Sequence, residues 1–301
     1  MLVSLPRKWA IKYGVKKGDE VEIEEDGNKL NITTQKGLVL KKAEIDISGL
    51  DRTSVLFYIR ALYRSGYDEI KVKFNEPYTM HIRIGEKKKV ITVIHDVINR
   101  LIGFEIIQHK EDYCIIKDIS EISAKDFDNV LQRIFVLLLD INKDLLSGVK
   151  SDNRQLIETI EEKHDNIMKF VGYSLRILNK KGYSDTRKIN TLYHIVSVLD
   201  KLVDVFKDAA RYIIVSDMRI SKECKPFLDQ IHNSVVIFND YFFNFDFKKV
   251  QQMYKNRDSI LKDIRKNLNK LPQSDINYLI HMTNLLEYIS DIADHRISME
   301  Y

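Results

Sequence analysis

The sequence predicts a multidomain α+β protein with an N-terminal β domain, a small α/β middle domain and a C-terminal all-α pair of three-helix bundles. Three observations predict this class. Residues 1–37 combine a basic helix pattern with alternating strand residues, and residues 38–120 alternate short strand and helix patterns. From residue 121 onward, long helical periodicities follow one another, and their pattern begins again after residue 217. The predicted domains are 1–37, 38–120, 121–217 and 218–301.

The first segment, VSLPRKWAIKYGVKKGDEVEI, predicts a strand, a helix and a second strand within about twenty residues. Pro6 suits the first helical position, where its missing N–H costs nothing, and Gly14 suits a left-handed helix end. Residues 17–19 then turn the chain into VEIEE, in which Val21 and Ile23 point to one side. The segment therefore predicts a small buried face.

Basic residues precede Asp19, the first carboxylate of the chain, so this end carries a local positive field. Such a field is typical of a surface that contacts phosphate groups, although a solvated basic helix has the same composition. The candidate DNA-binding residues are Arg7, Lys8, Lys12, Lys16 and Lys17.

Three motifs frame these charges, namely Leu5-Pro6-x-x-Trp9, Tyr13-Gly14-Val15 and Gly18-Asp19-Glu20-Val21. Together they resemble the SpoVT/AbrB swapped-hairpin family, in the version that is fused to archaeal PhoU-like regulators. In that family two chains interlace their hairpins, because one copy is too small to bury a core. The resemblance implies a homodimer that binds double-stranded DNA.

Two departures from that family bear on DNA binding. Family members usually carry a further strand ahead of the Leu-Pro motif, so we expect either a start upstream of Met1 or an incomplete hairpin. In better-known bacterial members, arginines that contact DNA stand where this chain has Ala10 and Ile11. The residues that could substitute for them are Arg7, Lys8 and Lys12.

Composition fits an intracellular protein of several domains, with 301 residues, of which 44% are hydrophobic and 31% charged. Cys114 and Cys224 are too few for a disulfide framework and lack zinc-site spacing, so we expect packing thiols. No apolar run approaches the roughly 18 residues of a membrane-spanning helix, and Met1 is not followed by a leader pattern. We therefore expect a cytoplasmic protein that is not embedded in a membrane.

The middle segment shows a small α/β pattern of strands and two helices. Asp51 is the expected N-cap of the first helix, and Gly66 is its expected stop. The expected strands are 43–49, 67–74, 80–85, 105–110 and 113–119, and the expected helices are 51–66 and 90–104. The segment has no Gly-rich phosphate loop and no nucleophile elbow, so we assign it a coupling role rather than a chemical one. Its sequence segments SGYDEIKV and RLIGFEII are similar to those of the middle segment of the same archaeal family.

Six helical patterns fill the rest of the chain. Ser151-Asp152 is the expected N-cap of the second helix, and Ser184-Asp185 opens the third. The expected helices are 127–146, 152–181, 185–215, 222–243, 247–268 and 274–297.

The two halves of this region form a degenerate internal repeat. Its matches pair Phe127 with Phe227, Asp165 with Asp258, Asp200 with Glu287, and Asp204 with Asp291. The repeat resembles the PhoU family, whose fold is two three-helix bundles and whose signature is E(D)xxxD in each bundle.

Carboxylates four residues apart share one helix face, so each motif offers two hard oxygen ligands at one point. The PhoU resemblance implies divalent or iron-type metal ions there, whereas helix geometry alone favours a solvated acidic face. Lys255 and Lys262 would offset the negative charge in the second bundle. The candidate metal ligands are Asp200, Asp204, Asp208, Glu287, Asp291 and His295, with Asp165 and Asp258 as weaker ones. Further acids of the second helix in each bundle are Glu161, Glu162 and Asp263.

No constellation of nucleophile, base and cleft argues for catalysis, so we expect no enzyme. The favoured interpretation is a DNA-binding transcriptional regulator of phosphate uptake and homeostasis, with the bundles as sensor or docking module. The alternative is a PhoU-type adaptor that binds a phosphate ABC transporter component or a kinase and uses its hairpin only to dimerise. A third interpretation, an antitoxin-like protein, predicts a short disordered tail instead of ordered bundles.

Overall fold

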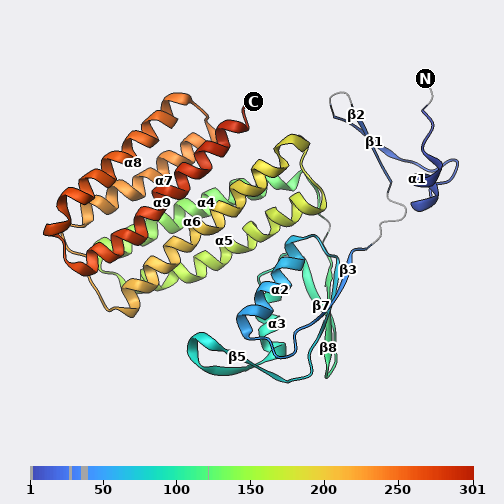
Figure 1. Cartoon of the computed structure of the whole chain (residues 1–301), viewed down its shortest axis with the longest axis horizontal. Coiled ribbons are helices and arrows are strands. Elements are labelled where there is room, and N and C mark those ends of the chain that lie inside the picture. The colour runs from blue at the N-terminus through green and yellow to red at the C-terminus, as the bar shows by residue number, and fades with distance from the viewer. Residues whose placement is uncertain (1–2, 27–28, 35–39, 121) are drawn as a thin grey trace.

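The computed structural model describes residues 3–26, 29–34, 40–120 and 122–301. Within these ranges the fold is α+β, as predicted, with N-terminal strands, a small sheet in the middle region and a C-terminal region of long helices (Figure 1). None of the helices in the described part of the chain is both long and apolar enough to span a lipid bilayer.

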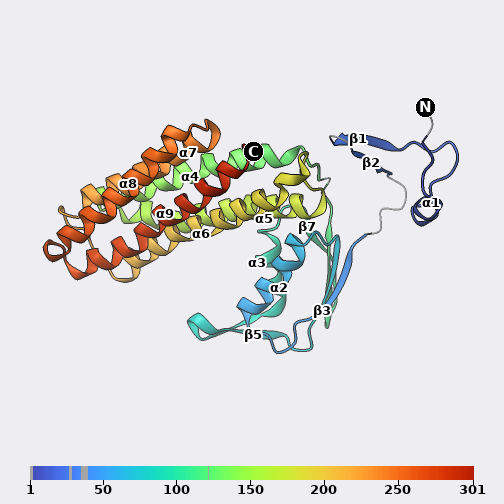
Figure 2. The same cartoon turned by 45° about the horizontal axis from the view of Figure 1, so that its top comes forward.

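The N-terminal region consists of one short helix and a hairpin, which lie apart from the other regions (Figure 1, Figure 2). Helix α1 spans Arg7–Lys12, and the antiparallel strands β1 and β2 span Glu22–Asp26 and Lys29–Thr33. The strand predicted ahead of the helix is wrong, since residues 3–6 have no regular secondary structure. A strand needs a hydrogen-bonded neighbour, and the described ladder of this hairpin joins β1 and β2 alone.

The hairpin has an apolar face that the single chain does not bury. Ile23 pairs with Ile32 across the ladder, and Leu30 pairs with Glu25, so these side chains share one face. The side chains of Ile23 and Leu30 are 58% and 52% exposed. The apolar face that the alternation predicted is therefore present, but it is not buried, because a single chain leaves it exposed to solvent.

The middle region forms a four-stranded sheet with two helices. The sheet order is β3-β4-β8-β7, in which β3 and β4 are parallel and the other pairs are antiparallel. The elements are β3 (Lys42–Asp46), α2 (Arg52–Arg64), β4 (Glu69–Lys73), α3 (Val90–Ile98), β7 (Phe104–His109) and β8 (Tyr113–Asp118). As predicted, the Asp51 carboxylate caps α2 by accepting from the N–H groups of Thr53 and Ser54.

Both helices of this region lie on one face of the sheet (Figure 1, Figure 2). On that face Ile70 and Val72 of β4 are fully buried against the core, as are Val55 and Ile59 of α2. The strand predicted at 80–85 is only partly correct, because β5 (Tyr78–His81) ends there in a 3-10 turn. That turn leads into β6 (Glu86–Lys89), a strand that the sequence pattern did not predict.

Six long helices form the C-terminal region within the described chain: α4 (Asp126–Ser151), α5 (Arg154–Lys180), α6 (Ile189–Val215), α7 (Lys225–Phe243), α8 (Phe247–Asn267) and α9 (Gln273–Ser298). Helix α5 packs between α4 and α6, while α7 contacts both α8 and α9. The two sets of three join where α6 packs along α9 and α4 packs against α7. This arrangement places α5 next to the middle region, where it packs against α2 (Figure 2).

The predicted N-cap of the second long helix, Ser151-Asp152, is wrong by one or two residues. Ser151 is the last residue of α4, and Asp152 follows in the left-handed conformation, with φ 54°. Asn153 is the actual N-cap, since its side chain accepts a hydrogen bond from the N–H of Leu156. A left-handed residue between the helices lets α4 end and α5 begin within three residues.

Candidate nucleic-acid interface and ion-pair cluster

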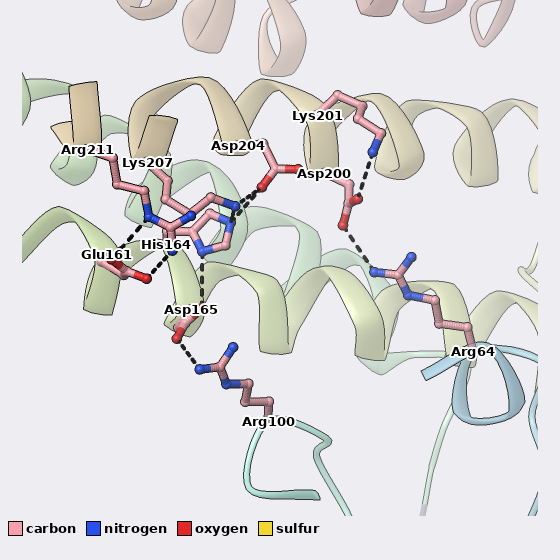
Figure 3. Close-up of polar contacts among 10 residues, drawn as sticks. All are labelled: Arg64, Arg100, Glu161, His164, Asp165, Asp200, Lys201, Asp204, Lys207 and Arg211. Atoms are coloured by element: carbon pink, nitrogen blue, oxygen red, sulfur yellow. Dashed lines mark hydrogen bonds and ion pairs between the residues drawn. The ribbon is translucent and has the colours of Figure 1, made fainter. Parts of the chain in front are cut away.

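Helix α6 carries the acidic motif of the first helical set. Asp200 and Asp204 lie one turn apart, as the spacing predicts, and both project toward α5 (Figure 3). Oδ1 of Asp200 lies 3.1 Å from Nη2 of Arg64, which belongs to α2 of the middle region. Asp204 is paired with Lys207 on its own helix. Asp208, one turn further along, is exposed.

Helix α5 supplies the other side of this cluster. His164 is 6% exposed, with Nδ1 at 3.2 Å from Asp165 and Nε2 at 3.0 Å from Asp204. Arg100, in the loop after α3, reaches the second oxygen of Asp165 at 2.8 Å (Figure 3). The cluster therefore joins α5, α6 and two segments of the middle region by ion pairs.

The protonation of His164 follows from these contacts. Burial lowers the pKa of His164, but its hydrogen bonds to Asp165 and Asp204 outweigh burial and leave that pKa raised. Burial also disfavours the charged form of Asp204, which raises its pKa. The contacts with His164 and Lys207 outweigh burial and hold the pKa of Asp204 well below its usual range. Both ring nitrogens of His164 can donate to carboxylates only in the imidazolium form. The geometry thus favours a charged His164 between two ionised carboxylates.

The acidic motif of the second helical set is built differently. Glu287 of α9 is exposed and accepts two hydrogen bonds from Nη2 of Arg257 on α8, at 2.7 and 2.5 Å. Arg257 also pairs with Asp258 at 2.9 Å. Asp291 is exposed, and His295 stacks edge-on against His194 of α6 with ring centroids 3.9 Å apart.

These positions lend no support to the predicted metal site, which stays a prediction. In the described ranges, no three His, Cys, Asp or Glu side chains are grouped so that they could hold a metal ion. Arginine and lysine side chains instead pair with Asp200, Asp204 and Glu287. The sequence reading missed these cations because Arg64 and Arg100 come from distant parts of the chain. Local signals were that Lys207 follows Asp204 by three residues, and that His164 and Arg257 directly precede the two matched aspartates.

The five basic residues of the N-terminal region are exposed. Arg7, Lys8 and Lys12 lie on α1, and Lys16 and Lys17 lie in the turn that follows. Over the described ranges, no carboxylate pairs with any of these five side chains, in contrast to Arg176, Arg211 and Arg257 of the helical region. Their charges thus remain available to an external anion.

Local hydrogen bonds hold this basic segment in shape. Helix α1 ends at Lys12, and Gly14 follows in the left-handed conformation with φ 65°, which suits glycine. The N–H of Val15 returns to the carbonyl of Ala10 at 2.9 Å. The Asp19 carboxylate accepts from the backbone N–H of Lys16 at 2.7 Å, which closes the next turn. These hydrogen bonds therefore hold the basic side chains of α1 next to those of the following turn.

Residues 3–40 match a protein-family model described as "Antidote-toxin recognition MazE, bacterial antitoxin". The N-terminal domain is MazE/AbrB-like. This result supports the swapped-hairpin part of the predicted resemblance, and the match ends where the middle region begins. Neither the curated proteins nor the solved structures gave a match to this chain. The MazE/AbrB-like domain gives the protein a possible role in DNA binding or regulation.

Proposed function

We propose that this protein is a DNA-binding transcriptional regulator that acts as a homodimer and has no enzymatic activity. One observation carries the proposal, namely the five exposed basic side chains of the MazE/AbrB-like domain that lack a carboxylate partner in the described chain. Charges of this kind gain affinity for DNA by releasing counterions from its phosphates. The observation favours Arg7, Lys8 and Lys12 on α1, with Lys16 and Lys17 in the adjoining turn, as the phosphate contacts.

The apolar face of the hairpin supports dimerisation. A two-stranded hairpin has little stability by itself in water, and here Ile23 and Leu30 are more than half exposed. Ile11, on α1, is 70% exposed. A second copy of the same domain would cover such a face, because MazE/AbrB-like domains commonly dimerise.

The helical region is proposed as the sensor or docking module of this regulator. The proposal that it responds to phosphate status, through a transporter component or a kinase, rests on the resemblance of the α6 and α9 motifs to the PhoU family. Coupling to the DNA-binding domain would require an effector that binds two arrangements of the dimer with different affinities.

Binding of fluorescent duplex DNA by the full chain tests the proposal. One duplex carries the sequence upstream of the protein's own coding region and the other is random, and both are titrated at several salt concentrations. The test variant is Arg7→Ala/Lys8→Ala. Its matched control is Arg265→Ala/Lys266→Ala, which removes the same two charges from an exposed site at the end of α8.

We expect affinity to fall steeply with salt and to be higher for the upstream duplex. The Arg7→Ala/Lys8→Ala variant should bind more weakly, and its log–log salt slope should become shallower by about 0.9 for each DNA phosphate that the variant no longer neutralises. The Arg265→Ala/Lys266→Ala control should bind like the wild type. Absence of binding at low salt, or equal weakening in both variants, would contradict the proposal and favour an adaptor that uses its hairpin only to dimerise.

A further inference from the structure

The hairpin of β5 and β6 projects from the middle region, and in both views its tip extends away from the four-stranded sheet (Figure 1, Figure 2). Among the described residues, its two strands pair only with each other. The tip is a 3-10 turn over Ile82–Ile84 that ends at Gly85, which is left-handed with φ 69°. The N–H of Gly85 donates to the carbonyl of His81 at 2.9 Å, so the turn is closed by a hydrogen bond.

Four large apolar side chains of this hairpin face solvent. Ile82, in the turn, is 70% exposed, and Ile84 is also exposed. Tyr78 and Met80 of β5 are exposed as well, and they share one face of the strand because they are two residues apart. Single exposed apolar residues are ordinary, whereas several that adjoin one another mark an interaction surface.

Cations lie among these apolar side chains. The ladder pairs Tyr78 with Lys89. It also pairs Met80 with Lys87, so cationic and apolar side chains share one face of the hairpin. Arg83 lies between the two isoleucines of the turn. All three cations are exposed, and no carboxylate in the part of the chain that the structure describes pairs with them.

The acidic side chains of this segment lie on the opposite face of the hairpin or at its base. Glu86, the one acid of the hairpin sequence, pairs with His81 across the ladder and therefore projects from the opposite face. Glu76 and Asp51 line a groove beside Tyr78 at the base of the hairpin, where the Asp51 carboxylate caps α2. The excess of positive charge is therefore greatest toward the tip.

This mixture of side chains distinguishes between classes of partner. Lysine is depleted in the cores of protein–protein interfaces. Proteins that bind DNA place cations against its phosphates and insert at most a few apolar wedges between its bases. At an anionic membrane, apolar and aromatic side chains enter the boundary between headgroups and acyl chains, while lysine and arginine reach the headgroup phosphates. The exposed face of the hairpin fits the membrane surface best.

We propose that the β5–β6 hairpin docks the protein on the surface of a membrane that contains anionic lipids. Ile82 and Ile84 enter the boundary between headgroups and acyl chains, while Lys87 and Lys89 contact the lipid phosphates. Such a contact lies on the bilayer and does not span it. The hairpin is separate from the MazE/AbrB-like domain, so the inference stands whether or not that domain binds DNA.

Co-sedimentation of the full chain with lipid vesicles tests the proposal. One vesicle preparation contains phosphatidylcholine and the anionic lipid phosphatidylglycerol, and the other contains phosphatidylcholine alone. The variant Ile82→Ser removes an apolar side chain from the tip. Its matched control is Ile280→Ser, at a position of α9 that is 59% exposed.

A second pair of variants tests the charges. Lys87→Gln/Lys89→Gln removes two cations from the apolar face of the hairpin. Its matched control, Lys255→Gln/Lys262→Gln, removes two exposed lysines of α8 that have no ion pair over the described ranges. All of these substitutions lie at exposed positions, so the thermal unfolding midpoints should match that of the wild type and separate loss of binding from loss of folding.

We expect the wild type to bind the mixed vesicles and to bind phosphatidylcholine alone more weakly. Ile82→Ser should lower the affinity for the mixed vesicles by about tenfold or more, because an apolar side chain no longer leaves water. Each lysine removed from the hairpin should lower that affinity by about fivefold. The two control variants should bind like the wild type.

The proposal is overturned if the wild type does not bind the mixed vesicles, or if Ile82→Ser and Ile280→Ser weaken binding equally. It is also overturned if binding is lost in Arg7→Ala/Lys8→Ala but unchanged in Ile82→Ser, which would assign the lipid contact to α1. Two other results overturn it when Ile82→Ser binds vesicles like the wild type. A loss of affinity for random duplex DNA would assign the hairpin to nucleic acid, and a lower molar mass by light scattering would assign it to a contact between two copies.

Discussion

Nη2 of Arg176 lies 2.6 Å from Oδ2 of Asp118, and this ion pair joins α5 to the last strand of the middle region. The Arg176 side chain is fully buried, and that of Asp118 is 3% exposed. Arg176 also donates to the carbonyl of Tyr63 at 2.7 Å and lies over the rings of Tyr63 and Phe104. The middle region is thus anchored on α5 through a buried charge.

Asp118→Asn should strongly destabilise the protein. The substitution leaves the Arg176 charge buried without a counterion, and the loss of one partner of a buried pair costs about 3–5 kcal/mol. Asp229→Asn is the matched control, because its pair with Lys150 is 44–46% exposed and such pairs contribute about 0–1 kcal/mol. Urea unfolding followed by circular dichroism measures both free energies of unfolding. Equal losses of unfolding free energy in the two variants would show that the buried charge of Arg176 does not need Asp118 as its counterion.

Gly148→Ala and Gly172→Ala should change stability in opposite directions, although both glycines lie in helices. A Cβ at Gly148 would lie 2.8 Å from Cγ1 of Ile157, where α4 meets α5, so Gly148→Ala should cost about 1–3 kcal/mol. A Cβ at Gly172 would meet Cε1 of Tyr63 at an ordinary 3.7 Å, so the better helix propensity of alanine should add up to about 1 kcal/mol. Thermal unfolding of the two variants beside the wild type tests this difference, which equal midpoints would refute.

The long helices were predictable because their apolar residues recur in the sequence at helical spacing, three and four residues apart. Helix α8 begins at Phe247, where the pattern predicted it, and Asp246 caps it. Strand β6 was missed because its sequence, EKKK, contains no alternation of apolar residues. The ion pairs of the candidate site could not be predicted either. Arg64 and Asp200 are 136 residues apart, and only tertiary packing brings them together.

His232 should make the protein less stable as the pH falls. It is 2% exposed where α7 meets α4, and its Nδ1 lies 2.6 Å from Oδ1 of Asn142. Burial lowers the pKa of His232 to about 4, whereas an unfolded histidine has a pKa of about 6.5. Between these values only the unfolded state takes up the proton, so up to about 3 kcal/mol of stability is lost as the pH falls through this window.

Urea unfolding at a series of pH values between 7 and 4 measures the contribution of His232. His232→Asn should flatten the pH dependence in this window. His109→Asn, at an exposed position in β7, should leave the wild-type dependence unchanged. A wild-type slope that persists in His232→Asn would assign the pH dependence to another group.

His164 should act in the opposite direction, because its folded pKa is raised rather than lowered. Asp165, Asp204 and Lys207 face this ring, and the two carboxylates favour its charged form. The stability that His164 contributes is therefore fully present below its unfolded pKa of about 6.5 and is lost as the pH rises through the raised folded pKa. His164→Asn should thus lose most stability relative to the wild type at mildly acidic pH, with a smaller difference at alkaline pH. Histidine ring protons in NMR spectra of the wild type and His164→Asn identify the resonance. A His164 pKa below 6.5, or a difference in stability that grows as the pH rises, would refute the charged bridge between Asp165 and Asp204.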